Sequence, residues 1–186
     1  MIAPDDTTFN YLFDKPRSPK ENDWDSALKY WNNLPSDIDA KYDKYIEINA
    51  ADLEPMVTYG TNPGMVVNIN DPIPINGDAS FKKAIDYMGI TPGKTLQNRD
   101  VDVVFIGSCT NSRLSDLKAA AHILKDRKVA NSVKMLVVPG SQKIKADAEK
   151  IGLNKIFKEA GAEWRESGCS MCLGMNGDTV DSGKLS

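Results

Sequence analysis

The stretch VDVVFIGSCTNSRLSDLKAAAHILKDRKVANSVKMLVVPG, residues 101–140, decides the fold of this 186-residue chain. Its first eight residues, VDVVFIGS, form a continuous apolar run rich in β-branched side chains, which is typical of a strand covered on both faces. A helix is expected next, over 112–127, with Asn111 or Ser112 as its N-cap. KMLVVPG (134–140) then predicts a second buried strand, so the order indicates a parallel β-α-β unit.

The same alternation continues towards the C-terminus. SQKIKADAEKIG (141–152) and LNKIFKEAG (153–161) predict two helices, the first capped by Ser141 and the second closed by Gly161. AEWRES (162–167) predicts a short third strand. The expected class is therefore α/β, a three-layer α/β/α arrangement around a mainly parallel sheet.

The N-terminal part is less regular. Residues 1–48 are expected to form an irregular, partly helical lead segment, and 49–186 the α/β domain. Within the lead segment, DWDSALKYWNNL predicts a helix capped by Asn22 or Asp23 and stopped by Pro35. Its two tryptophans, Trp24 and Trp31, share one apolar face, and we expect them to pack against neighbours rather than to bind a ligand.

The segment between the lead and the first buried strand combines alternation with turn residues. YIEIN (45–49) and MVTYG (56–60) predict strands, and the Asn-, Pro- and Gly-rich stretch 61–78 predicts a long loop. FKKAIDYMGI (81–90) predicts a short helix that ends at Gly89.

Composition excludes several classes of protein. Hydrophobic residues make up 41% of the chain and charged residues 26%, as in ordinary globular domains. With 23 Lys and Arg against 26 Asp and Glu, the net charge of −3 predicts no nucleic-acid partner and no membrane surface. The sequence also predicts no transmembrane helix and no signal peptide, and an odd count of three cysteines argues against a disulfide scaffold. We expect a cytoplasmic protein.

All three cysteines follow predicted strands. Cys109 lies in FIGSCTNSR, and Cys169 and Cys172 form a C-x-x-C pair in ESGCSMCLGM. Because ligands gather at the carboxyl ends of parallel strands, these distant thiols can belong to one site.

Three interpretations of the cysteines compete. Incidental thiols would explain Cys109 better than the C-x-x-C pair, and a redox pair would need a helix after Cys172, where Gly174 follows instead. Metal binding normally takes four ligands, and the single histidine, His122, sits in a predicted helix as an ordinary surface or packing residue. Three thiolates therefore indicate an incomplete site, or an iron–sulfur cluster with one iron left open as a Lewis acid.

Small polar residues surround the cysteines. Their hydroxyl and backbone N–H groups can donate hydrogen bonds to cluster sulfides, although turns and N-caps use the same residue types. These residues are Thr110, Asn111, Ser112, Gly168 and Ser170.

Two long stretches carry a resemblance to a known family. FIGSCTNSRLSDLKAAA and VKMLVVPGSQKIKADAEKIGLNKIFKEAGAEWRESGCSMCLGMN resemble the cluster-binding domain of the aconitase superfamily, most closely its branch of 3-isopropylmalate dehydratase large subunits. MIAPDDTTFNYL, INAADLEP and VTYGTNPG agree with that branch, so the resemblance covers nearly the whole chain.

The resemblance implies a cofactor and a reaction. Cys109, Cys169 and Cys172 match the three family cysteines that bind a [4Fe–4S] cluster. The implied enzyme is a hydro-lyase of leucine biosynthesis that removes water from 3-isopropylmalate and returns it to give 2-isopropylmalate. Four residues, Thr58, Gly60, Thr61 and Asn62, resemble a loop that lines the family's active site.

The chain also departs from the family. Family large subunits are more than twice as long, and neither their catalytic His and acidic residues nor their Asn-Arg segment after the C-x-x-C has a match here. We therefore expect a fragment without catalytic residues of its own and inactive alone, whose partners are the rest of the large subunit, a separate small subunit and the substrate. The alternatives are a fragment of homoaconitase or of a related malate-type dehydratase, and a cluster-free structural fragment.

Overall fold

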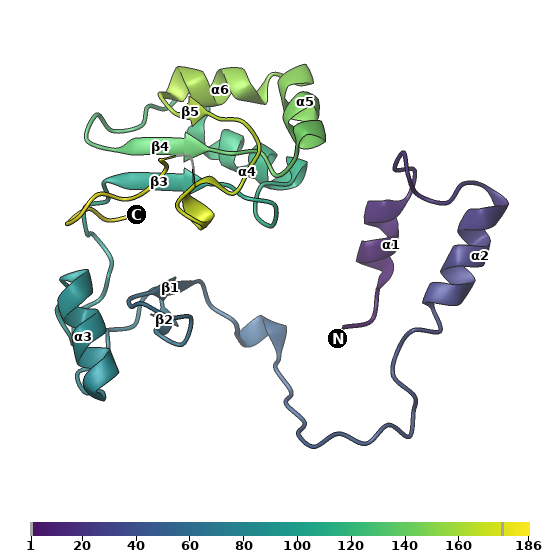
Figure 1. Ribbon diagram of the computed structural model, residues 1–186, viewed down its shortest axis with the longest axis horizontal. Helices are drawn as coiled ribbons and strands as arrows, with labels where there is room; N and C mark the ends of the chain where they lie inside the picture. The colour runs from purple at the N-terminus through teal and green to yellow at the C-terminus, as the bar shows by residue number, and fades with distance from the viewer. Residues whose placement is uncertain (1, 176) are drawn as a thin grey trace. The chain divides into compact units, whose positions relative to one another are not determined.

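Residues 2–175 and 177–186 are described by this computed structural model, in which the chain divides into two units, Met1–Leu53 and Glu54–Ser186. The expected domain boundary between residues 48 and 49 stays a prediction. Figure 1 shows the order of the helices and strands in both units.

The first unit contains two helices, α1 (Asp6–Leu12) and α2 (Asn22–Trp31). Trp31 stacks on the ring of Phe9 at 5.8 Å between centroids, and Trp24 meets the edge of Trp31 at 5.6 Å. The prediction that both tryptophans pack is confirmed.

The predicted cap of α2 is wrong. The N-cap is Glu21, at a φ of 47°, so Asn22 and Asp23 both lie inside the first turn. No side-chain hydrogen bond caps this helix; instead, the N–H groups of Asp23 and Trp24 donate to the backbone carbonyls of Lys20 and Glu21, each at 3.0 Å.

The predicted strand over 45–49 is also wrong. These residues pair with no described strand, and every residue from 32 to 50 is exposed. Alternation alone does not make a strand, because the ladder hydrogen bonds need a partner. A short 3-10 turn (Ala50–Asp52) follows.

The second unit begins with a hairpin and a helix. Strands β1 (Met56–Thr58) and β2 (Val66–Asn68) pair antiparallel, so the predicted long loop in fact contains a strand. Helix α3 (Ala79–Met88) ends at Gly89, as expected, with a φ of 58°. One apolar cluster joins these elements, formed by Tyr59, Met65, Ile73, Phe81, Ala84, Ile85 and Ile90.

The main sheet is parallel, as the sequence predicts. Its strands are β3 (Val103–Ile106), β4 (Lys134–Val137) and β5 (Glu163–Trp164), in that spatial order. β3 and β4 are shorter than the apolar runs that contain them, and β5 is shorter than the strand predicted over 162–167. The carboxyl ends of β3, β4 and β5 therefore meet at one edge, from which the cysteine loops emerge.

Three helices cover this sheet: α4 (Leu114–Leu124), α5 (Gln142–Lys150) and α6 (Leu153–Ala160). They pack against one another, and right-handed connections between successive neighbouring strands place them on one face (Figure 1). The α/β class is confirmed, with this one helical layer on the sheet among the described residues. The core between helices and sheet consists of Leu117, Ala121, Met135, Val137, Ala148, Leu153, Phe157 and Ala162.

The helix caps in this unit are partly as predicted. Ser141 caps α5 by accepting a hydrogen bond from the Ile144 N–H at 3.2 Å, and Gly161 ends α6 at a φ of 98°. The predicted cap of α4 by Asn111 or Ser112 is wrong, because the helix begins one residue later, with Arg113 as its N-cap. None of the helices in the described part of the chain is long and apolar enough to cross a membrane.

Candidate functional site

The loop that carries Cys109 leaves the end of β3. Ser108 has a φ of 69°, in the left-handed region, and turns the chain away from the strand direction. Cys109 is exposed, with its Sγ atom 3.8 Å from the Thr110 hydroxyl. Ser112 lies fully buried at the far side of the loop, and its hydroxyl has no hydrogen-bond partner. The N-cap of α4 is instead Arg113, whose backbone N–H donates to the Asp116 carboxylate at 3.0 Å.

The segment that follows β4 contacts the Cys109 loop. The Gly140 N–H donates to the Ser112 carbonyl at 3.0 Å. A Cβ atom at Gly140 would lie 2.9 Å from that carbonyl oxygen and 3.3 Å from that of Ser108. The absent side chain thus allows β4 to approach the loop this closely.

The C-x-x-C pair occupies a single tight turn after β5. Ser170–Cys172 forms a 3-10 turn in which the Cys172 N–H donates to the Cys169 carbonyl at 3.0 Å. The Met175 N–H donates back to the Ser170 carbonyl at 2.9 Å. No helix follows in the described residues beyond Leu173, which argues against a thioredoxin-like redox pair.

The two cysteine loops share a hollow at the carboxyl edge of the sheet. It encloses about 440 Å³ and brings Cys172 beside residues that flank Cys109. The residues that line it are Phe105, Ile106, Gly107, Ser108, Asn111 and Cys172. The expectation that distant cysteine loops meet at this edge is therefore met for the Cys109 loop and Cys172.

The thiols themselves are open and unpaired with one another. Cys109, Cys169 and Cys172 are all exposed free cysteines. Across residues 2–175 and 177–186, no three His, Cys, Asp or Glu side chains gather closely enough to hold a metal ion. His122 is exposed on α4. As donor types, three thiols from loops at one sheet edge match a cluster bound by three thiolates.

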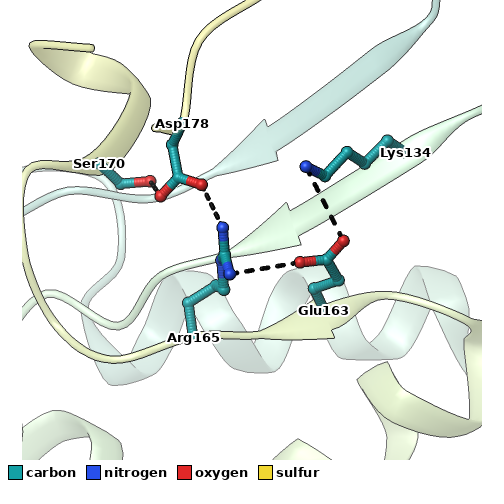
Figure 2. A network of polar contacts seen from close by, with 5 residues as sticks. All are labelled: Lys134, Glu163, Arg165, Ser170 and Asp178. Carbon is teal, nitrogen blue, oxygen red and sulfur yellow. Dashed lines mark hydrogen bonds and ion pairs between the residues drawn. The ribbon is translucent and has the colours of Figure 1, made fainter. Parts of the chain in front are cut away.

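A network of charged side chains contacts the C-x-x-C turn through Ser170 (Figure 2). The Ser170 hydroxyl donates to Asp178 Oδ2 at 2.8 Å, and Arg165 forms an ion pair with the same carboxylate. Arg165 also lies 3.5 Å from Glu163, which in turn lies 4.0 Å from Lys134 on β4. The hydrogen bond from Ser170, together with Arg165, holds the pKa of Asp178 below its ordinary value.

A second group of charges ties α5 to the start of the same loop. Lys145 forms ion pairs with Glu166 and, at 3.7 Å, with Glu149. The hydrogen bond between Lys145 and Glu166 raises the pKa of the lysine and lowers that of the glutamate. Both groups are therefore charged at neutral pH. The segment between β5 and Cys169 is thus held by two ion pairs, Glu166 with Lys145 and Arg165 with Asp178.

Sequence reasoning missed Asp178 and Arg165 altogether. Asp178 is 8 residues beyond Ser170 and 13 beyond Arg165, with no periodic pattern to link the three. Gly140 carried a weak signal, a Gly-Ser pair directly after a strand.

The residues expected to line an active site lie in the turn of the β1–β2 hairpin. Thr58 ends β1, and the side chain of Asn62 closes the turn by accepting from the Gly64 N–H at 2.9 Å. Their contribution to a site stays a prediction.

Comparison with known proteins identifies the family. The chain is 54% identical to the 3-isopropylmalate dehydratase large subunit of Roseiflexus castenholzii (strain DSM 13941 / HLO8), in an alignment that covers 99% of this chain and 40% of that protein. The chain thus spans well under half the length of this curated relative. The family model described as aconitase family (aconitate hydratase) matches residues 1–186. The match extends over the full sequence, cysteine loops included, and this chain therefore belongs to the aconitase family.

Proposed function

We propose that this chain is part of the large subunit of a 3-isopropylmalate dehydratase, a hydro-lyase of leucine biosynthesis. The reaction interconverts 3-isopropylmalate and 2-isopropylmalate through loss and return of water. The observation that carries the proposal is the 54% identity to a large subunit of that name along 99% of the chain. That name also favours this substrate over the one a homoaconitase would take.

Within that enzyme, Cys109, Cys169 and Cys172 would hold a [4Fe–4S] cluster through three thiolates. When bound, such a cluster supplies one open iron as a Lewis acid for the hydroxyl group that leaves. The exposure of all three thiols supports this role, as does the hollow that Cys172 shares with the loop of Cys109.

The chain's own residues would prepare the site rather than move the substrate's protons. The turns at Cys109 and at the C-x-x-C pair expose short polar side chains and backbone N–H groups beside the thiols. Such groups donate hydrogen bonds to cluster sulfides and keep the thiolates oriented. Acid–base residues would come from elsewhere in the subunit, and the small subunit would help to recognise the alkyl group of the substrate.

We propose that the isolated chain does not turn over isopropylmalate. It spans 40% of the length of its relative, and the remainder of that protein together with a small subunit would complete the active site. The proposed location is the cytoplasm.

Anaerobic reconstitution with iron and sulfide tests the cofactor assignment. We expect about four irons and four sulfides per chain, because a cubane cluster contains four of each. The variant C109S/C169S/C172S should bind almost none, since a serine hydroxyl does not replace a thiolate ligand. The measurement is iron and sulfide analysis of the desalted protein, together with its visible spectrum.

The matched control is H122Q, which removes the single histidine from an exposed position on α4. It should take up as much iron as the parent. Equal iron in the triple serine variant and the parent would refute the ligand assignment. A folded parent chain that takes up no iron would favour the cluster-free alternative.

A further inference from the structure

Ser170, between the two cysteines of the C-x-x-C pair, has an unusual backbone conformation. Its φ is 49°, in the left-handed region that disfavours every residue with a side chain, and it is only 3% exposed. Glycine would adopt this conformation at lower cost. What serine offers here and glycine does not is a hydroxyl group, which donates a hydrogen bond to the Asp178 carboxylate at 2.8 Å.

Asp178 is a buried charge in the segment that follows the cysteines. It is 6% exposed, and its two oxygens are both engaged, Oδ2 by Ser170 and Oδ1 by Arg165. A buried carboxylate costs free energy unless it is paired and hydrogen-bonded, and this one is both.

Arg165 connects this carboxylate to the sheet. It directly follows β5 and donates its own backbone N–H to the Val137 carbonyl at the end of β4, at 3.0 Å. Its guanidinium also faces Glu163, and Glu163 faces Lys134, so four charges of alternating sign run from β4 to Asp178 (Figure 2). The position of Asp178 is thus set by the strands and not by the loop alone.

Backbone hydrogen bonds close the loop around the same point. The Asp178 N–H donates to the Met175 carbonyl at 3.0 Å, and the Met175 N–H donates to the Ser170 carbonyl at 2.9 Å. Ser170 and Asp178 are therefore joined twice, through side chains and through Met175. Cys169 and Cys172 lie within the turn that this double connection holds.

We propose that Asp178 is a positioning residue for the C-x-x-C pair: by holding the Ser170 hydroxyl and Arg165 together, its carboxylate fixes the turn that directs Cys169 and Cys172 towards a bound cluster. The role towards a cluster rests on the proposed function. The hydrogen bond between Ser170 and Asp178, however, is present in the chain without iron. The two can therefore be tested apart.

The first test measures amide hydrogen exchange of the iron-free chain by mass spectrometry. Asparagine has a single acceptor oxygen, so D178N can serve Ser170 or Arg165 but not both. We expect peptides covering residues 170–175 to exchange about tenfold faster in D178N, as follows from losing one hydrogen bond to a charged group. Exchange in α4 and β4 should stay at the parent's rates.

The control and the partner variant make this test specific. D181N removes an exposed carboxylate from the same segment and should leave the loop unchanged. S170A should speed loop exchange as D178N does, and the double variant should exchange no faster than either single variant, because both changes break the same contact. Loop exchange in D178N equal to that in D181N, or additive effects in the double variant, would overturn the proposal.

The second test measures retention of iron. After anaerobic reconstitution to equal iron content, D178N should lose iron to a chelator about tenfold faster than the parent and D181N. Equal rates of loss would show that Asp178 does not position the ligands. If the parent itself takes up no iron, the proposed function fails, and the exchange experiment still decides whether Asp178 holds the turn.

Discussion

Gly140, three residues after β4, shows how a single residue shapes the loop that follows the neighbouring strand β3. Its N–H holds the Ser112 carbonyl, and the space where a Cβ atom would sit is already filled by backbone oxygens. Backbone atoms cannot rotate away as a flexible side chain can. Any side chain at this position must therefore move the loop that carries Cys109.

We predict that G140A destabilises the chain by about 1–3 kcal/mol, the usual cost of inserting a methyl group into a well-packed site. Urea unfolding followed by circular dichroism measures the change. The matched control is G168A, because a Cβ atom at Gly168 meets nothing within 4 Å and its φ lies outside the left-handed region. Equal stability of the two variants would show that the close approach of β4 does not constrain the loop.

At the scale of elements, the C-terminal segment Gly177–Ser186 is held to the main sheet at two points. One is Asp178, beneath the C-x-x-C turn. The other is Asp102, just before β3, whose carboxylate accepts from Lys184 Nζ at 2.7 Å and from the Leu185 N–H at 3.0 Å. The Leu185 carbonyl in turn accepts from the N–H groups of Asp102 and Val103, so this segment continues the hydrogen bonding at the start of the strand.

The Asp102–Lys184 pair predicts a dependence of stability on pH. Its hydrogen bonds lower the pKa of Asp102 from 3.8 and raise that of Lys184 from 10.5. A lowered carboxylate pKa stabilises the fold above pH 3.8, and this contribution disappears as the pH falls through the lowered value. A raised lysine pKa contributes below pH 10.5 and is lost above the raised value.

We therefore expect D102N to have a lower melting temperature than the parent at pH 7, with the difference shrinking as the pH falls below about 3.8. Thermal unfolding across pH 3 to 7 measures it, and D71N, at an exposed carboxylate away from this pair, serves as a control of equal charge change. A difference between D102N and the parent that is constant across this range would contradict an ionic origin.

At the scale of the whole molecule, the two units differ in how they are stabilised. Glu54–Ser186 contains two apolar clusters, whereas Met1–Leu53 relies on aromatic contacts between two short helices. Between α2 and the 3-10 turn at Ala50, every residue is exposed, including Tyr45, Ile46 and Ile48. Such a segment offers little resistance to local opening.

Limited proteolysis should therefore cut this chain first within residues 35–50. Trypsin has Lys41 and Lys44 available there, and chymotrypsin has Tyr42 and Tyr45. Mass spectrometry of the earliest products should show a protected piece that begins near residue 45. Lys118, on the packed helix α4, is the internal comparison and should be cut late. Early cleavage within α4–α6 would contradict this division of stability.

The sequence alone was enough to predict the parallel sheet and the helices that cover it, and to single out the three cysteines. Continuous apolar runs mark β3 and β4, and Gly89, Ser141 and Gly161 end or begin helices by chemistry that acts within a few residues. The motifs around the cysteines were enough to recognise the family, because a motif is defined by residue types in a fixed order along the chain.

Tertiary structure alone decided the rest. The alternating segment 45–49 stayed unpaired because no described strand lies beside it, and α4 is capped at Arg113, through Asp116, and not at Ser112. The hydrogen bond from Ser170 to Asp178 joins two residues that no local sequence pattern relates. Pairing, burial and ion contacts depend on which distant residues meet, and their free energies exist only once the chain has folded.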